Sequence, residues 1–145
     1  MKRMYIGSDH AGFSVKEKLK DALGDRYELT DLGCFSEDPC DYPDIAREVA
    51  EKVSDNKESV GILICGTGTG MAMTANKLIG VRAAVCNTEE LASAARRHNN
   101  ANVLALGARN NTEDELVKIA NVFLSTEFET NEERHVRRVN KIDGL

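Results

Sequence analysis

The residues with the clearest chemical potential lie between Gly61 and Gly70, where an apolar run ends at Cys65 and a glycine-rich loop follows. A loop of this kind, placed between a strand and a helix, presents free backbone N–H groups beside the cysteine. Those groups would stabilise a thiolate, and they could bind the oxyanion that forms when the sulfur removes a proton next to a carbonyl. Two interpretations of Cys65 stay open: an acid/base group, or a small core residue at a strand end.

Other chemistries that use a glycine loop fit the spacing less well. A dinucleotide site has G-x-G-x-x-G in the first strand-and-helix unit, whereas this chain has G-x-G-x-G in the third unit. A P-loop needs lysine after its last glycine, and a cysteine-dependent phosphatase needs an arginine that closes the loop, but Met71 stands there. A nucleotide-binding module without catalysis stays open as an alternative.

Further titratable residues have a functional and a structural interpretation each. His98 could transfer protons at neutral pH, or it could be a cation at the end of a helix. Asp9 and His10 could belong to a site or to a helix cap, and Tyr42 could simply precede a helix that begins at Pro43. Several arginines could form an anion pocket or lie on solvated helix faces: Arg96, Arg97, Arg109, Arg134, Arg137 and Arg138.

Strand-like and helix-like segments alternate along the chain, which predicts a parallel sheet with helices on both faces. We expect strands at residues 4–7, 27–32, 60–65, 81–86 and 102–106. Helices are expected at about 12–23, from Pro43 past Val53, from the glycine loop to Leu78, from a capping box at Asn87 to His98, from Thr112 to Leu124, and from Thr130 onwards.

Ligands of parallel sheets bind beyond the carboxyl ends of the strands. Asp9 and His10 follow the first expected strand, Cys65 to Gly70 follow the third, and Arg109 follows the fifth. His98, by contrast, lies just before the fifth strand and therefore at the opposite edge. This placement indicates that a second subunit completes the site.

Length and composition limit the class of protein. A chain of 145 residues with 41% hydrophobic residues predicts one globular domain over residues 1–145. The net charge of −5 argues against a general nucleic-acid surface, and no apolar run predicts a membrane span or a secretory signal. The four cysteines form no C-x-x-C pair, so we expect a cytoplasmic protein with reduced thiols, without a disulfide framework or a zinc site.

With these residues assembled, the chain resembles the type B ribose-5-phosphate isomerases and their wider sugar-phosphate isomerase family. The resemblance implies a three-layer, doubly wound, Rossmann-like α/β fold with five parallel strands. It also implies dimers or dimers of dimers whose active sites use both subunits, and no metal or organic cofactor. The motifs that carry it are Gly7 to Phe13, Asp41-Tyr42-Pro43, Ile64 to Gly68, Ala75-Asn76-Lys77, Arg96 to Asn99, Asn102 to Arg109, and Arg134-His135 with Arg138.

The resemblance also implies a role for each matching residue. Cys65 would be the base that moves a proton between C2 and C1 through a cis-enediolate, and His98 would open the furanose ring with Asp9 nearby. The developing oxyanion would be held by the loop residues Gly66, Thr67, Gly68, Thr69 and Gly70. The phosphate would be bound by His10, Arg109, Arg134 and Arg138, and the sugar would be lined by Tyr42 and Asn99.

Subgroup features favour a homo-oligomeric ribose-5-phosphate isomerase of the pentose phosphate pathway. One branch of the family uses a glutamate at the position of Met71 instead of the cysteine, and the galactose-6-phosphate isomerases divide these motifs between two different subunits. This chain has the cysteine and all the motifs together. Thr69 and Asn100 depart from the family pattern, and an isomerase of a six-carbon aldose 6-phosphate, allose 6-phosphate or galactose 6-phosphate, is the alternative.

Overall fold

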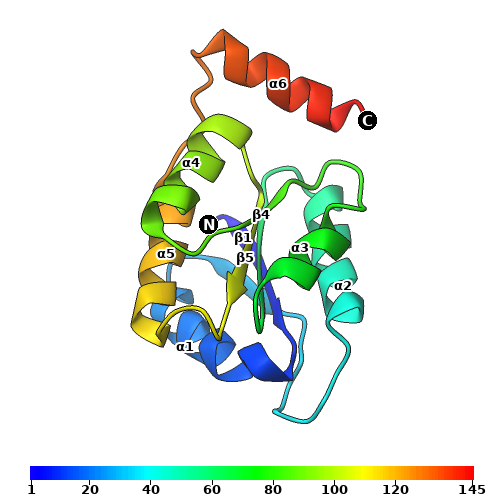
Figure 1. Ribbon diagram of the computed structural model, residues 1–145, viewed down its shortest axis with the longest axis vertical. Coiled ribbons are helices and arrows are strands. Elements are labelled where there is room, and N and C mark those ends of the chain that lie inside the picture. The colour runs from blue at the N-terminus through cyan, green and yellow to red at the C-terminus, as the bar shows by residue number, and fades with distance from the viewer.

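Five parallel strands form one sheet at the centre of the computed structural model, which describes residues 1–145 (Figure 1). The strands are β1 (Arg3–Ser8), β2 (Glu28–Asp31), β3 (Val60–Cys65), β4 (Ala83–Val85) and β5 (Val103–Gly107), in the order β2-β1-β3-β5-β4. The helices are η1 (His10–Gly12), α1 (Phe13–Leu23), α2 (Tyr42–Asp55), α3 (Thr69–Ala75), α4 (Glu89–Asn99), α5 (Glu113–Ser125) and α6 (Glu133–Asp143). The expected doubly wound α/β fold is confirmed.

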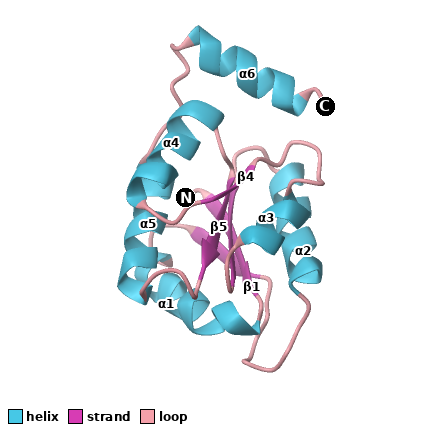
Figure 2. Cartoon of the chain, viewed as in Figure 1, coloured by secondary structure: helices cyan, strands magenta, loops and turns pink.

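Helices cover both faces of the sheet, with α1, α4 and α5 on one side and α2 and α3 on the other (Figure 2). Successive side chains of a strand point to opposite faces, so β3 contributes to two cores. Ile62 and Ile64 belong to the core under α1 and α5, whereas Leu63 and Cys65 belong to the core under α2 and α3. All six residues of β3 are buried, which explains the continuous apolar run in the sequence.

The chain reverses its winding between β1 and β3. From β1 it moves outward to β2, and then it crosses back so that β3 lies on the other side of β1. In an open parallel sheet this switch leaves a crevice beyond the carboxyl ends of the two strands. Asp9 follows β1 and Cys65 ends β3, so the fold brings both residues to that crevice.

Helix α6 lies apart from the three layers. Figure 1 shows it crossing one end of the molecule, where it packs on α4. Only His135 and Val139 of this helix are buried. Most of its surface is therefore available to another protein chain.

One expected helix end is wrong, because a side chain forms hydrogen bonds that the local sequence does not reveal. Helix α3 ends at Ala75 and not at Leu78. The side chain of Asn76 donates to the Ala83 carbonyl at 3.0 Å and accepts from the Ala83 N–H at 2.8 Å. These two bonds fix Asn76 beside β4 and turn the chain.

Two of the three helix starts expected at Asn87, Thr112 and Thr130 are also wrong. The cap of α4 is Thr88, which accepts from the Leu91 N–H at 3.1 Å, and not Asn87. Helix α6 begins after Glu132 without a side-chain cap, so Thr130 has no such role. The helix start expected at Thr112 is confirmed.

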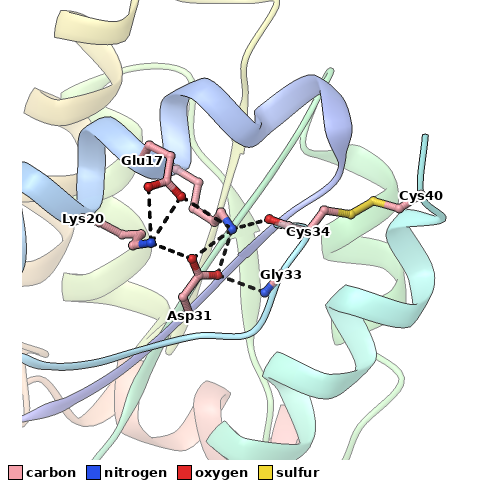
Figure 3. A network of polar contacts seen from close by, with 7 residues as sticks. Glu17, Lys20, Asp31, Gly33, Cys34 and Cys40 are labelled. Carbon is pink, nitrogen blue, oxygen red and sulfur yellow. Dashed lines mark hydrogen bonds and ion pairs between the residues drawn. A yellow bond between two sulfur atoms is a disulfide. The ribbon is translucent and has the colours of Figure 1, made fainter. Parts of the chain in front are cut away.

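A buried ion pair fixes the start of the loop between β2 and α2 (Figure 3). The Lys16 side chain is fully buried, and its Nζ donates to Asp31 Oδ1 at 2.8 Å and to the Cys34 carbonyl. Asp31 also accepts from Lys20 and from the Gly33 N–H. Burial works to raise the pKa of Asp31, but these hydrogen bonds outweigh it and hold that pKa below the ordinary value.

The same loop contains a disulfide between Cys34 and Cys40, whose Cα atoms lie 6.9 Å apart. The expectation that all four cysteines are reduced is therefore wrong for this pair. The loop turns back on itself beyond Gly33, which brings together two thiols that the sequence spacing did not pair. Cys65 and Cys86 are free and buried.

We predict that Asp31→Asn destabilises the fold, because it leaves the buried Lys16 charge without its partner. At neutral pH the free energy of unfolding, measured by urea denaturation, should fall by about 3–5 kcal/mol. Since the folded state lowers the pKa of Asp31, the pair contributes above the unfolded value of 3.8 and is lost as the pH falls through the lower folded pKa. When the pH is lowered below about 4, the free energy of unfolding should therefore fall less in the variant than in the wild type.

Asp114→Asn is the matched control, because Asp114 pairs with Lys18 and its side chain is 81% exposed. It should leave the free energy of unfolding nearly unchanged. Equal stability of Asp31→Asn and wild type at neutral pH would contradict this role of the ion pair.

Candidate functional site

Cys65 is the last residue of β3, and a backbone donor is aimed at its sulfur. The residue is only 6% exposed, and its Sγ accepts a hydrogen bond from the Gly68 N–H at 3.1 Å. Thr67 is the first exposed residue of the loop. Its hydroxyl oxygen accepts a hydrogen bond from the Thr69 N–H at 3.3 Å. A thiolate formed here would have a hydrogen-bond donor already in place.

Two glycines of the loop allow other side chains to approach it closely. A Cβ atom at Gly66 would lie 3.0 Å from Nη1 of Arg109, so the guanidinium lies directly over this part of the loop. A Cβ atom at Gly70 would lie 2.3 Å from the Tyr42 ring. The glycines thus bring a cation and a phenol from distant parts of the chain to the mouth of the Cys65 site.

Asp9 and His10 reach the same edge from β1. The Asp9 N–H donates to the Ile64 carbonyl at 3.1 Å, and the Asp9 carboxylate accepts from the Gly12 N–H at 3.1 Å. The His10 ring is exposed, and its Nδ1 accepts a hydrogen bond from the Cys40 N–H at 3.3 Å. Because Nδ1 is an acceptor here, Nε2 carries a proton and can donate it to an anion.

The carboxyl edge therefore gathers most of the expected site residues: Asp9, His10, Tyr42, Cys65, Gly66, Thr67, Gly68, Thr69, Gly70 and Arg109. They provide a thiol, backbone donors, a carboxylate, an imidazole, a phenol and a guanidinium around one crevice. Such a set can remove a proton from a carbon, stabilise the resulting oxyanion and hold an anionic group nearby.

The remaining expected residues lie at the amino edge and do not reach this crevice. His98 and Asn99 end α4, and the chain then enters the sheet where the Asn102 carbonyl accepts the Gly61 N–H at 2.9 Å. Gly61 stands at the start of β3 and Cys65 at its end. At ~3.3 Å per strand residue, the edges with His98 and Cys65 are separated by roughly 13 Å of β3 alone.

Arg134 and Arg138 belong to the His98 side of the molecule. Both are exposed on α6, and Arg134 contacts Glu132 at 3.4 Å. They lie four residues apart in the sequence, so they share one face of the helix. A single chain thus has two groups of site residues, one at each edge of its sheet.

Charged and aromatic side chains form a cluster beside His98 that the sequence did not predict. The His98 ring stacks on His135 with 4.5 Å between ring centroids, and the His135 Nε2 lies 3.5 Å from the Glu129 carboxylate. Arg97 Nη1 lies 3.4 Å from His98 Nε2 and 3.3 Å from Glu129. The motif Arg134-His135 indicated the region, but no sequence signal pointed to Glu129.

Three members of this cluster could provide metal ligands, because the donor atoms of His98, Glu129 and His135 lie within 4.8 Å of one another. The geometry does not suit a metal ion. The lone pairs of stacked imidazoles lie in nearly parallel ring planes and do not converge on one point, and the Arg97 cation already occupies the neighbourhood of the carboxylate.

A cavity of about 440 Å³ lies at the amino edge between the start of β4 and the end of α6. Asn99 lines it together with Ala101, Arg82 and Ile142. Cys65 does not line it, so this cavity is separate from the crevice with the thiol.

No helix of the chain has the length and apolarity needed to cross a membrane.

Comparisons with known proteins agree with the geometry. The sequence model of the family described as Ribose/Galactose Isomerase matches residues 4–142. A probable ribose-5-phosphate isomerase B of Mycoplasma genitalium is 44% identical over 142 residues, which are 96% of this chain and 92% of the relative.

Two solved structures are similar throughout. A ribose 5-phosphate isomerase of Thermotoga maritima has a TM-score of 0.93 and 44% identity, and the match covers 99% of both chains. A ribose-5-phosphate isomerase B of Mycoplasma genitalium with bound ribulose-5-phosphate has a TM-score of 0.93 and 43% identity, over 98% of this chain and 94% of the other.

Proposed function

Since the chain belongs to the ribose/galactose isomerase family, we propose that it is an aldose-ketose isomerase that interconverts D-ribose 5-phosphate and D-ribulose 5-phosphate. The observation that carries the proposal is the Cys65 thiol in the crevice, with the Gly68 N–H at 3.1 Å from its sulfur. The near-complete match to a structure that holds ribulose-5-phosphate supports this substrate.

The isomerisation needs one base and one oxyanion site. Cys65 would remove the proton from C2 of the open-chain aldose as the carbonyl oxygen on C1 becomes an enediolate oxygen. The loop N–H groups and the Thr67 hydroxyl would bind the negative charge. A proton would move from the C2 hydroxyl to the C1 oxygen, and the thiol would return its proton to C1, which leaves the carbonyl at C2 and gives the ketose. These steps use only groups of the polypeptide.

The phosphate would be bound by N–H donors from both edges. His10 offers a protonated Nε2, and Arg109 lies over Gly66 at the mouth of the crevice. Arg134 and Arg138 are exposed on α6 and would complete the phosphate site from another chain. Asp9 and Tyr42 would contact the sugar on the first chain, and Asn99 would contact it on the second.

This division supports a homo-oligomer, at least a dimer, because His98 is at the wrong edge to serve the Cys65 of its own chain. Surface features favour the same conclusion. Helix α6 buries only two of its residues, and apolar side chains are exposed on α3 and in the segment before β4, with Met73 at 67% and Ile79 at 80%. A second copy would cover such side chains.

The cytoplasm is the compartment that we propose, because the substrate is a phosphorylated sugar of central metabolism. Disulfides are rare there. The proposed compartment therefore rests on the substrate and not on the Cys34–Cys40 pair. An isomerase of a six-carbon aldose 6-phosphate is the second candidate, since the family description includes galactose.

Cys65→Ala is expected to lower kcat for ribose 5-phosphate by about 10²–10⁴-fold, the usual worth of general acid-base catalysis. The assay follows ribulose 5-phosphate formation, with allose 6-phosphate run in parallel. The control is Cys86→Ala, because burial raises the pKa of the Cys86 thiol to about 11 and keeps it protonated. Wild-type rates with Cys65→Ala would show that another group is the base, and a preference for allose 6-phosphate would favour the second candidate.

Arg138→Ala should raise KM for the phosphorylated substrate with little change in kcat, because it removes binding that ground state and transition state share. One charge-assisted hydrogen bond is worth about 1.5–3 kcal/mol, so KM should rise by roughly 10- to 100-fold. Arg47→Ala is the control, since Arg47 pairs with Glu51 on the exposed face of α2. An unchanged KM for Arg138→Ala would remove this arginine from the site.

A further inference from the structure

We propose that His135 and Glu129 are positioning residues for His98: they hold its imidazole at a fixed place relative to the phosphate-binding arginines of α6. The inference rests on the proposed function and adds residues to which that function assigns no role. It starts from an unusual burial, because His135 is 7% exposed on a helix whose other buried residue is Val139.

His135 makes the contact between α6 and the functional end of α4. Its ring stacks on His98 with an interplanar angle of 26° and 4.5 Å between centroids. An aromatic contact of this kind restricts both side chains to a narrow range of rotamers. The stack therefore fixes where the His98 ring points.

The Glu129 carboxylate contacts both side chains that neighbour the His98 ring, His135 and Arg97. One carboxylate oxygen lies 3.5 Å from His135 Nε2, and the other lies 3.3 Å from Arg97 Nη1. The Glu129 N–H also donates to the Arg97 carbonyl at 3.1 Å, so this segment is tied to α4 by backbone as well as by charge. Removal of the carboxylate would free His135 and Arg97 together.

The position of His135 in the sequence sets the distance between His98 and the phosphate-binding arginines of α6. Arg134 precedes it directly, and Arg138 follows three residues later on the same helix. When His135 stacks on His98, both arginines are placed at a defined distance from the ring-opening group. The furanose and its phosphate have fixed geometry, so catalysis depends on that distance.

Ring opening offers a readout that a purely structural role would not change. It breaks the C1–O4 bond, removes the proton of the C1 hydroxyl as the carbonyl forms, and places a proton on O4, with no oxidant or reductant. Ribose 5-phosphate is a furanose and must open. Ribulose 5-phosphate is an open chain, because its 5-hydroxyl is esterified, and it needs no such step.

The experiment measures both directions at increasing enzyme concentration with wild type, Glu129→Gln, His135→Phe and His135→Ala. In the variants, conversion of ribose 5-phosphate should be about tenfold slower than in the wild type and should rise less than in proportion to enzyme, because ring opening becomes limiting. Conversion of ribulose 5-phosphate should stay proportional to enzyme. His135→Phe preserves the stack, so it should show the smaller defect.

Glu133→Gln, an exposed change on the same helix, is the control and should behave like the wild type. Melting temperatures establish that each variant is folded, and Glu129→Gln preserves the test if His135→Ala does not fold. Parallel loss of rate in both directions, or no loss, would overturn the inference. Activation of the wild type by Zn²⁺ that Glu129→Gln abolishes would also overturn it. A wild type without isomerase activity would instead refute the proposed function.

Discussion

All five strands run in the same direction, and the distribution of chemistry over the molecule depends on this constraint. A parallel sheet gathers every carboxyl end at one edge, so residues that follow β1, β3 and β5 meet although they are distant in sequence. The same rule sends the ends of the intervening helices to the other edge. Cys65 and His98 are consequently separated by the sheet, and the proposed reaction would join them through a second copy.

The carboxyl edge is organised by close backbone approach and by one buried ion pair. Gly66 and Gly70 admit the Arg109 guanidinium and the Tyr42 ring, which no residue with a Cβ would allow without displacement. The pair of Lys16 and Asp31 holds the beginning of the loop that leads to Tyr42. Packing beneath the site thus determines which groups can meet a ligand above it.

The sequence was sufficient where structure depends on local pattern. Residues 60–65 were predicted as a strand with the observed bounds, because a strand buried on both faces needs an unbroken apolar run. The end of α3, the Thr88 cap, the Cys34–Cys40 bond and the Glu129 cluster were not predictable in this way. The cap and the disulfide depend on the course of a single loop, whereas the other two depend on contacts between segments that only the tertiary fold brings together.

The most direct test of a site shared between copies uses two inactive chains, Cys65→Ala and His98→Asn, expressed together with different tags. Dimers that carry both tags contain one site with Cys65 and His98 intact and one site that lacks both. With ribose 5-phosphate as substrate they should show about half of the wild-type activity, although each variant alone is nearly inactive. Mixed dimers no more active than the separate variants would contradict a site built from both edges of the sheet.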